Sequence, residues 1–471
     1  MERAVDVAVL GAGTAGLAAY RAAVASGARA VIIEAGAHGT TCARVGCMPS
    51  KLLIAAADAA HTARTAGPFG VRTTVDVDGR AVMDRVRRER DRFVGLVIEG
   101  VEKLPREDRI AGRARFVAPG RLEVDGGPVV NARSVVIATG ASPVVLPMFE
   151  GVRDRLVVND DVFAWEALPE SVAVFGAGVI GLELGQALHR LGVRVRLFGR
   201  DGLVGPVTDP VVRAAAARAF EAEFPALFDA SVTSVRPHAD GVAVTWVLDG
   251  EARTETFAHV LVATGRRPNV SGIGLEHAGI DLDARGLPRF DARTMQVGRA
   301  PVFIAGDATN DRPLLHEAAD EGRIAGENAA RFPDVRAGER RSFLAITFTD
   351  PQIAIVCATW AELSRRGELI AGEVSFVDQG RSRVMRRNHG AARVYADART
   401  GRFLGAEMAG PSAEHIGHTL AWAHQQGLTV DQMLAMPFYH PVVEEGIRTA
   451  LRDASARLAR RPASAAPTIA A

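Results

Sequence analysis

The chain has 471 residues, which is enough for about three domains of ordinary size. Its 56 basic and 55 acidic side chains give a net charge of +1, which argues against nucleic acid or an anionic membrane as the main partner. Three cysteines are too few for a secreted disulfide framework, and no apolar run reaches the ~18 residues of a membrane helix, so a cytoplasmic protein is expected.

The first elements in the chain are predicted to form a dinucleotide-binding unit. Its parts, in chain order, are a strand (Val5–Leu10), the glycines Gly11, Gly13 and Gly16, a helix (Leu17–Ser26) and a second strand (Ala30–Ile33) that ends at Glu34. In this motif the first glycine permits a tight turn, the second lets the backbone approach a pyrophosphate, and the third allows close packing of helix on strand. Glu34 is placed to accept hydrogen bonds from a ribose.

Cys42 and Cys47 follow within the segment GTTCARVGCMPSK. A disulfide needs Cα atoms within roughly 4.4–6.8 Å, whereas residues five apart in a regular helix are about 8–9 Å apart. If the pair bonds, the segment between the cysteines is therefore a loop or a distorted first turn. Pro49 suits the first turn of a helix, which places Cys47 at a helix N-terminus, where the dipole favours a thiolate. Two buried apolar cysteines near a turn are the alternative.

A long amphipathic helix with a solvated basic face is predicted over Ala81–Leu104. The dinucleotide unit then recurs, as a strand (Ser171–Phe175), the glycines Gly176, Gly178 and Gly181, a helix (Leu182–Leu191) and a strand (Val193–Phe198). The position that matches Glu34 is Gly199, and Arg200 follows it. Two further strands echo each other, one ending at Thr139-Gly140 and the other at Thr264-Gly265. Two such units imply two nucleotides that face each other.

The last third of the chain has a different pattern. A strand over Pro301–Ala305 ends at Gly306-Asp307, whose carboxylate can meet a chain of hydroxyls; a simple turn aspartate is the alternative. From Arg341, four strands (Phe343–Phe348, Glu373–Val377, Ala392–Ala396, Arg402–Met408) and two helices (Ala413–Gln426, Val430–Met436) predict an α+β domain, with a disordered tail from Ala454. His440, which prolines bracket and Glu444 and Glu445 follow, is a candidate catalytic base.

These motifs together resemble the flavin-dependent pyridine nucleotide–disulfide oxidoreductases, and among them the dihydrolipoamide dehydrogenases, over about residues 4 to 453. The resemblance implies an α/β fold with two Rossmann-like domains and a C-terminal α+β dimerisation domain. The expected boundaries are 1–148 and 271–340 for the FAD domain, 149–270 for the NAD(P) domain, 341–453 for the interface domain and 454–471 for the tail. No metal site is expected.

The resemblance also implies roles for individual residues. Asp307 would hold the ribityl chain of FAD, Lys51 would lie near the flavin N5 and pair with Glu183, and His440 with Glu445 would form the acid–base pair that reaches the Cys42–Cys47 disulfide of the other subunit of a homodimer. The residues expected to bind the cofactors are Gly11, Gly13, Gly16, Glu34, Thr41, Lys51, Thr139, Gly140 and Asp307, and, in or near the second unit, Gly176, Gly178, Gly181, Glu183, Arg200 and Gly265.

The implied reaction is oxidation of a dithiol, dihydrolipoamide on a carrier protein or a small dithiol, with NAD as the acceptor and NADP as a possible substitute. Gly199 lacks the acid that would repel a 2′-phosphate, so weak discrimination between the two nucleotides is expected, and Gly199→Glu is predicted to raise the preference for NAD. The chain departs from the family's usual pattern at Thr40 and Arg44 beside the cysteines, and at Val442 and Glu444 after His440. A reductase of a different disulfide and a flavin-bearing binding protein without turnover remain as alternatives.

Overall fold

The computed structural model describes residues 2–367 and 369–460. The chain divides into two compact units, and each unit contains segments that are far apart in the sequence. The first unit contains the chain up to Glu150, Leu156–Leu168 and Val262–Arg340, and the second contains Gly151–Arg155, Pro169–Leu261 and the chain from Arg341 onward. The first unit is interrupted and resumes at Val262, and the domain boundaries that the sequence suggests stay a prediction.

A seven-stranded sheet forms the centre of the first unit, in the order β3-β2-β1-β6-β5-β4, with β17 also paired to β6. Its strands are β1 (Glu2–Leu10), β2 (Ala30–Glu34), β3 (Arg109–Ala111), β4 (Ala114–Ala118), β5 (Arg121–Val124), β6 (Val129–Ile137) and β17 (Val302–Ile304). Strand β1 runs parallel to β2 and β6, with Val7 opposite both Ala30 and Ser134. The hairpin of β4 and β5 adds antiparallel strands at one edge.

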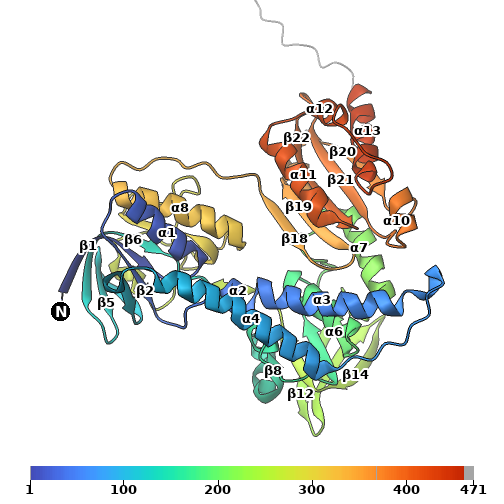
Figure 1. Ribbon diagram of the computed structural model, residues 1–471, viewed down its shortest axis with the longest axis horizontal. Coiled ribbons are helices and arrows are strands. Elements are labelled where there is room, and N and C mark those ends of the chain that lie inside the picture. Colours follow the sequence, from blue (N-terminus) through green and yellow to red (C-terminus); the bar gives the residue numbers. More distant parts are fainter. Residues whose placement is uncertain (1, 368, 461–471) are drawn as a thin grey trace, which may run out of the picture. The chain divides into compact units, whose positions relative to one another are not determined.

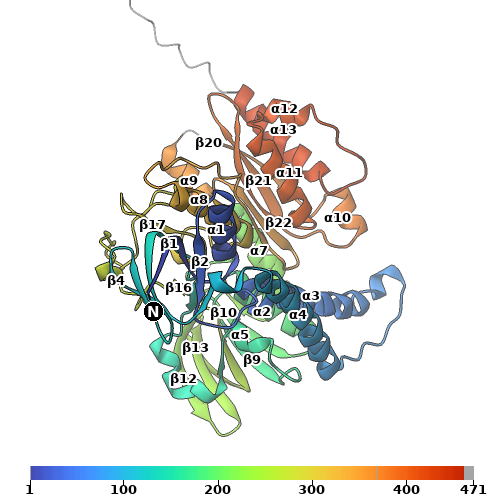
Figure 2. The same ribbon diagram turned by 60° about the vertical axis from the view of Figure 1, so that its left-hand side comes forward.

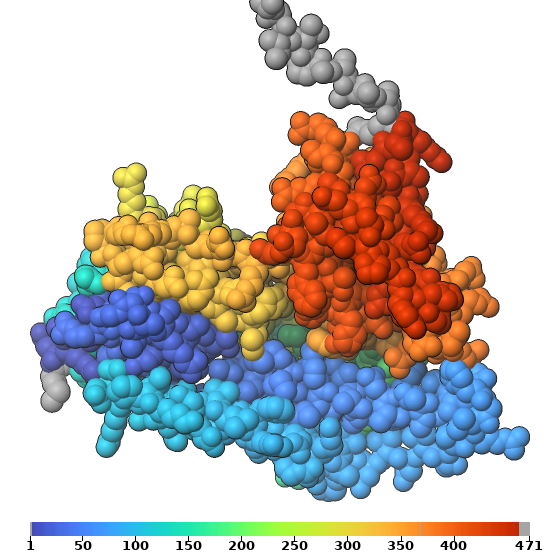
Figure 3. Space-filling model, turned by 45° about the horizontal axis from the view of Figure 1, so that its top comes forward, coloured from blue at the N-terminus to red at the C-terminus, as the bar shows by residue number. Residues whose placement is uncertain are grey.

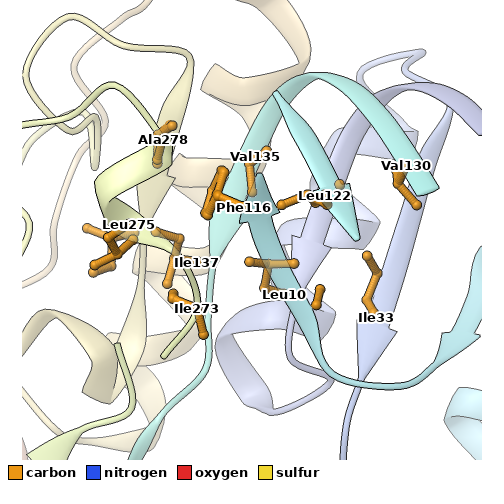
Figure 4. Close-up of a cluster of buried hydrophobic side chains, with 14 of the residues drawn as sticks. Leu10, Ile33, Phe116, Leu122, Val130, Val135, Ile137, Ile273, Leu275 and Ala278 are labelled. Carbon is orange, nitrogen blue, oxygen red and sulfur yellow. The ribbon is translucent and has the colours of Figure 1, made fainter. Parts of the chain in front are cut away.

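Alternating side chains of this sheet enter two different hydrophobic cores, as the two-residue period of a strand requires. Ala8 and Leu10 pack with Ile33, Phe116 and Ile137 on one face, in a cluster that Leu275 and its neighbours complete (Figure 4). Val7 and Val9 enter the other core, which the helices α1 (Thr14–Ala25) and α8 (Leu315–Arg331) cover. The predicted strand and helix after it are confirmed, with bounds that differ by a few residues.

The helices α1 and α8 pack with their backbones in contact. A Cβ atom added at Gly322 would lie 2.2 Å from the carbonyl oxygen of Ala15, and one at Gly326 would lie 2.1 Å from that of Ala19. Only glycine allows so close an approach. The two helices lie side by side in the ribbon view, and their surfaces meet in the space-filling view, α1 in dark blue and α8 in yellow (Figures 1 and 3).

Three helices of the first unit follow β2. They are α2 (Thr41–Val45), α3 (Cys47–Arg64) and α4 (Gly79–Glu102). The predicted long amphipathic helix is α4, and Asp78 caps it by accepting hydrogen bonds from the Arg80 and Ala81 amides at 3.0 Å each. A short helix, α5 (Asn159–Val162), and a small antiparallel pair, β7 (Ala141–Pro143) with β16 (Arg266–Pro268), complete the parts of this unit that bear on the site.

The second unit begins with the repeated dinucleotide-binding pattern. Its parallel strands β9 (Ser171–Phe175), β10 (Arg194–Phe198) and β11 (Ala226–Leu227) adjoin β15 (His259–Val262), and its helices are α6 (Val179–Arg190) and α7 (Pro210–Glu223). An antiparallel meander, β12 (Ser231–His238), β13 (Gly241–Leu248) and β14 (Glu251–Phe257), was not predicted. Its alternation of polar and apolar residues is the signal that would have revealed it.

The rest of the second unit is a five-stranded antiparallel sheet in the order β18-β19-β22-β21-β20 (Figure 2). The strands are β18 (Leu344–Thr347), β19 (Gln352–Cys357), β20 (Leu369–Ser375), β21 (Ala391–Asp397) and β22 (Phe403–Gly410). The helices of this part are α9 (Trp360–Leu363), α10 (Gly380–Val384), α11 (Ala413–Gln425), α12 (Val430–Leu434) and α13 (Glu445–Ala459). The α+β pattern is as predicted, but β19 was missed.

The predicted tail from residue 454 is wrong at its start. Helix α13 continues to Ala459, and Ala454 is fully buried in the core that α11, α12 and α13 form with the sheet. The error has a physical cause, because an alanine-rich, arginine-rich segment has high helix propensity and its small residues fit a close helix–sheet contact. Residues 461–471 lie outside the described residues.

Candidate functional site

The first glycine fingerprint has the geometry that a dinucleotide needs. Gly11 has a φ of +102°, and a Cβ there would lie 2.4 Å from the Ala138 oxygen. A Cβ at Gly16 would lie 1.8 Å from the Gly11 oxygen, so helix α1 packs against its own entry turn. Gly13, by contrast, has no atom within 4 Å of its Cβ position. Close backbone packing therefore explains the first and third glycines, whereas the second leaves open space for a ligand.

A cavity of about 460 Å³ lies at this turn, entirely within the first unit. Segments of the chain that contribute to its lining are 10–13, 33–37, 40–41, 112–114, 138–140 and 267–269, together with Arg44, Ser142, Ser271 and Ile273. Of the predicted cofactor residues, Gly11, Gly13, Glu34, Thr41, Thr139 and Gly140 line it. Such a volume between strand ends and a helix N-terminus suits a nucleotide.

The polar groups of this cavity suit the adenosine half of FAD. Glu34 Oε2 accepts a hydrogen bond from the Ala12 amide at 2.6 Å and Oε1 accepts one from Gly36 at 2.8 Å. Each carboxylate oxygen keeps a lone pair for ribose hydroxyls. The buried Thr139 Oγ1 has no hydrogen-bond partner among the described residues. A buried hydroxyl without a partner is costly, which fits a ligand group at this point of the lining.

Asn269, which follows the second Ala-Thr-Gly strand, holds the end of the first such strand by two hydrogen bonds. Asn269 donates from Nδ2 to the Thr139 oxygen at 3.1 Å and from its amide to the Gly140 oxygen at 2.9 Å. Sequence reasoning missed Asn269, although the echo of the two strands was the signal that could have found it. Gly265 itself does not line the cavity; its oxygen accepts from the Val144 amide at 3.0 Å. A cofactor role for Gly265 stays a prediction.

Asp307 lies in the turn η5 (Gly306–Thr309) that follows strand β17. Burial raises the pKa of its carboxyl, and the charge of Arg266 lowers it. The parallel strands β1, β6 and β17 end at the same edge of the sheet, so Asp307 and the fingerprint lie at that edge. The placement is the one that the sequence predicts, whereas the contact of Asp307 with a ribityl chain stays a prediction.

The cysteines lie at a break between two helices. Cys42 belongs to α2, Cys47 is the first residue of α3, and Gly46 between them has φ −127° and ψ −116°, outside the helical region. The predicted distorted turn and the helix N-terminus at Cys47 are therefore confirmed. Asn159, which sequence reasoning missed, donates from Nδ2 to the Val45 oxygen at 3.0 Å and holds the end of α2. No local sequence signal connects it to the cysteines.

The two cysteine side chains lie in different surroundings. Cys42 is half-buried and Cys47 exposed. A hydrogen bond with Cys47, and then burial, raises the pKa of the Cys42 thiol, while the charge of Lys51 lowers it. Cys47 lies at the positive end of α3, where the helix dipole favours a thiolate. Lys51, one turn further along α3, donates to the Ser50 hydroxyl at 3.3 Å.

The second fingerprint repeats the geometry of the first. Gly176 has a φ of +110°, a Cβ at Gly181 would lie 1.8 Å from the Gly176 oxygen, and Gly178 again has open space. Arg200, after β10, is 88% exposed and pairs with Asp201 at 3.0 Å. Glu183 on α6 is buried and accepts from the Phe348 amide at 2.8 Å. Lys51 and Glu183 belong to different units, and their pairing stays a prediction.

His440 and Glu445 form the pair that the sequence predicts. His440 Nδ1 lies 3.0 Å from Oε2 and 3.1 Å from Oε1 of Glu445, the first residue of α13. The hydrogen bond from His440 lowers the pKa of Glu445. Because the carboxylate occupies Nδ1, the exposed Nε2 is the nitrogen that can exchange a proton with a substrate. Glu444, between the two in the chain, lines a groove with Val442, Phe438 and Tyr439.

Other site types have no counterpart in the part of the chain that the structure describes. Over residues 2–367 and 369–460, no cluster of three or more His, Cys, Asp or Glu side chains is arranged to hold a metal ion. Nor does any described helix combine the length and the apolarity that crossing a membrane requires.

Comparison with known proteins places this constellation in a family. Residues 5–322 match the family model described as pyridine nucleotide-disulphide oxidoreductase, and residues 344–451 match the dimerisation domain of the same family. The dihydrolipoyl dehydrogenase of Haloferax volcanii is 30% identical over 462 residues, which are 95% of this chain and 96% of that protein. The mercuric reductase of Acidithiobacillus ferrooxidans is 32% identical over 94% of this chain and 81% of its own length.

A solved structure confirms the fold. The flavoprotein disulfide reductase RclA of Escherichia coli superposes with a TM-score of 0.79, covering 95% of this chain and 99% of its own, at 22% identity. The predicted α/β fold is thereby confirmed. The family brings FAD and NAD(P) as cofactors, and its dimerisation domain supports a homodimer. The chain therefore belongs to the pyridine nucleotide–disulphide oxidoreductases, with the redox cysteine motif at Cys42 and Cys47.

Proposed function

We propose that the chain is a dihydrolipoyl dehydrogenase, which oxidises dihydrolipoamide on a carrier protein to lipoamide with NAD⁺. The active form is a homodimer in the cytoplasm, in which His440 and Glu445 of one subunit act on the Cys42–Cys47 disulfide of the other. The similarity to the dihydrolipoyl dehydrogenase of Haloferax volcanii along nearly the whole of both chains supports this substrate.

The observation that carries the proposal is the different placement of the two sulfurs: Cys47 is the exposed first residue of α3, and Cys42 is half-buried in α2. A dithiol–disulfide exchange needs one sulfur that is attacked and another that leaves as a stable thiolate. The N-terminus of α3 favours a thiolate on Cys47, while a hydrogen bond with Cys47 and burial raise the pKa of the Cys42 thiol. This assigns Cys42 to the exchange with substrate and Cys47 to the leaving position.

The protein's own residues supply the proton transfers. His440, held by Glu445, accepts a proton from one substrate thiol through Nε2. The resulting substrate thiolate attacks Cys42 of the disulfide, a bond to Cys42 forms, and the bond between the two cysteines breaks to leave a thiolate on Cys47. The second substrate thiol then displaces Cys42; His440 returns its proton to Cys42 and takes up the proton of the second thiol. The substrate ends as a disulfide, and the protein carries a thiol on Cys42, a thiolate on Cys47 and a protonated His440.

The residues that would hold FAD are those of the first fingerprint, with Glu34 at the ribose, Thr139 and Gly140 along the cavity, and Asp307 at the ribityl chain. When bound, FAD supplies the two-electron relay between the cysteine pair and the nicotinamide nucleotide. Gly176, Gly178 and Gly181 provide the corresponding backbone cradle for the nucleotide.

An NAD(P)H-dependent reductase of a different disulfide is the second candidate. Arg44 stands between the cysteines where the family usually has asparagine, and Val442 and Glu444, which line the groove beside His440, also depart from the usual residues. These changes surround the two places that a substrate must contact. The mercuric and RclA-type relatives illustrate how many electron acceptors the family serves.

A turnover assay separates the candidates. Purified, FAD-loaded protein is given dihydrolipoamide with NAD⁺ and, separately, NADH or NADPH with lipoamide, glutathione disulfide and a peptide disulfide. The proposal expects dihydrolipoamide with NAD⁺ to be at least tenfold better, in kcat/KM, than any other pair. A faster reaction with another disulfide supports the second candidate, and no reaction with any thiol supports a binding protein without turnover.

A further inference from the structure

A fully buried glutamate lies directly behind the turn that carries Asp307. Glu321, on α8, has an exposed side-chain fraction of 0%. Its Oε2 accepts a hydrogen bond from the Gly306 amide at 2.8 Å, and its Oε1 lies 2.7 Å from Arg340 Nη2. A buried carboxyl group is costly unless its oxygens are bonded, and here each oxygen has its own partner.

Arg340 connects this glutamate to two other acids. Its Nη2 also lies 2.7 Å from Glu317 Oε2, and its Nη1 lies 3.0 Å from Asp311 Oδ2. The Arg340 and Glu317 side chains are 13% and 4% exposed, whereas Asp311 is 42% exposed. Of the three acids, only Glu321 reaches the Gly306–Asp307 turn; Glu317 pairs instead with Arg340 and Arg312.

Two further features restrict the turn of Gly306–Thr309: tight packing at Gly306 and a hydrogen bond from Thr309. Gly306 has a φ of +71°, and a Cβ there would lie 2.9 Å from the Ala15 Cβ on α1. The Thr309 hydroxyl closes the turn by donating to the Gly306 oxygen at 2.8 Å. Glu321 directly precedes Gly322, which holds α8 in backbone contact with Ala15. The same contact region thus joins α8, the fingerprint helix α1 and the turn.

We infer that Glu321 is a positioning residue for FAD: through its hydrogen bond to the Gly306 amide, with Arg340 holding its other oxygen, it fixes Asp307 relative to the first glycine fingerprint. The inference rests on the proposed function, because Asp307 is given there as the ligand of the ribityl chain. Loss of the Glu321 hydrogen bond releases the amide of the residue before Asp307, so the effect must appear in FAD binding itself.

Glu317 offers a matched control. It is buried like Glu321 and touches the same guanidinium at the same distance, but it does not contact the turn. Glu321→Gln and Glu317→Gln therefore each remove one carboxyl group from the same buried network. If the network only stabilises the fold, the two variants lose FAD affinity in parallel. If Glu321 positions Asp307, the two variants diverge in FAD affinity although both destabilise the protein.

The experiment titrates FAD into deflavinated protein and follows flavin fluorescence, with the visible spectrum of the bound flavin and the melting temperature of the FAD-free protein as parallel readouts. We expect Glu321→Gln to weaken FAD binding at least tenfold and to change the flavin spectrum. Glu317→Gln should stay within about threefold of the wild type while lowering the melting temperature similarly. Equal losses in the two variants, or no loss in Glu321→Gln, overturn the inference.

Aspartate variants keep the test decisive if Glu321→Gln fails to fold. Glu321→Asp keeps the charge beside Arg340, but its shorter side chain cannot span both partners, so FAD binding should weaken at least fivefold; Glu317→Asp should leave it within about twofold. Equal FAD affinities in these two variants reject the role of Glu321. A wild-type protein that takes up no FAD contradicts the proposed function as well, whereas a loaded wild type with an unaffected Glu321 variant contradicts this inference alone.

Discussion

Gly199 lies against the backbone of Phe228, so that a Cβ at residue 199 would come within 3.0 Å of the Phe228 Cα and oxygen and of the Ala177 Cβ. Residue 199 is the position at which the first fingerprint carries Glu34. The expectation that Gly199→Glu would simply add an acid for the ribose is therefore revised, because the added side chain must first displace its neighbours. A side chain at residue 199 thus requires Ala177 or Phe228 to shift by a few tenths of an ångström, and nucleotide choice is tested more directly at the next residue.

Arg200→Gln should reduce the use of NADP more than the use of NAD. Arg200 is exposed and paired with Asp201, so its contact with a 2′-phosphate contributes ~1 kcal/mol, or about fivefold in kcat/KM. Asp201→Asn is the matched variant: it frees the guanidinium and should improve NADP use. Steady-state kinetics with both nucleotides measure the ratio. Unchanged ratios in both variants would show that another residue reads the ribose.

Cys47→Ser should abolish the long-wavelength charge-transfer absorption of the two-electron-reduced, FAD-loaded protein, with FAD still bound. The reason is that Cys47 lies at the N-terminus of α3, whose dipole favours a thiolate there. Cys42→Ser is the control: its Cys47 sulfur cannot form the disulfide, so the absorption should appear in the FAD-loaded variant without any reductant. Absorption that survives in Cys47→Ser and disappears in Cys42→Ser would reverse the assignment of the two sulfurs.

Mixing His440→Ala and Cys47→Ser subunits should restore activity. Each homodimer of a single variant is expected to be nearly inactive, whereas a heterodimer contains one site with both His440 and Cys47 intact. A purified heterodimer should reach about half of the wild-type kcat, because one of its two sites is complete. Differently tagged subunits allow the heterodimer to be isolated. A heterodimer as inactive as its parents would show that each subunit completes its own site.

The fold class and the local geometry of the candidate site follow from the sequence, whereas several distant segments of the architecture do not. The glycine fingerprints, the break at Gly46 and the His440–Glu445 pair follow from short-range spacing, because a few neighbouring residues determine each of them. Strand β19 and the meander β12–β14 were missed, and the tail was predicted too early at Ala454, because pairing with distant strands and burial decide those segments.

Residues that make contacts over long sequence distances were also missed. Asn159 is 114 positions from Val45, and Asn269 is 130 positions from Thr139, yet each pair is joined by a hydrogen bond. Glu321 lies in a helix whose pattern gives no sign that a charge is buried there. Such contacts exist only because the sheet and its helices bring the segments together.

Glu321 should make the stability of the protein fall as pH rises from about 4.5 to 7. Burial raises its pKa from 4.5 to about 7, against the opposing effects of Arg340 and the Gly306 amide; Asp311 and Glu317 add to the increase. A raised folded-state pKa gives stability that is present below pH 4.5 and is lost as pH passes through 7, here about 3 kcal/mol in all at 1.36 kcal/mol per pH unit.

Glu321→Gln should remove this component. The difference in melting temperature between the FAD-free wild type and the variant should therefore shrink or reverse from pH 5 to pH 8, because only the wild type must ionise a buried group. A difference that stays constant across this range would mean that Glu321 keeps one protonation state throughout. Glu317→Gln, measured in parallel, controls for the general loss of a buried acid.

Thr40→Gly should stabilise the protein slightly, although it removes a helix cap. Thr40 has φ 58° and ψ 151°, a region that is almost exclusive to glycine and costs other residues about 1–3 kcal/mol. Its hydroxyl caps α2 by accepting from the Ala43 amide at 3.3 Å, and glycine forfeits only a few tenths of a kcal/mol at such a position. The added freedom of the unfolded chain costs ~0.4–1 kcal/mol.

At Thr40, relief of the backbone strain therefore outweighs the two losses by up to about 2 kcal/mol. Thr359 is the control, because it caps a helix without that strain. Thr359 caps α9 by the same contact, accepting from the Glu362 amide at 3.3 Å, but at an ordinary φ of −83°. Thr359→Gly should thus lower the melting temperature of the FAD-free protein, while Thr40→Gly should raise it or leave it unchanged. If Thr40→Gly lowers it as much as Thr359→Gly does, contacts of the Thr40 side chain compensate for its backbone strain, and the departure from glycine beside the cysteines is itself stabilising.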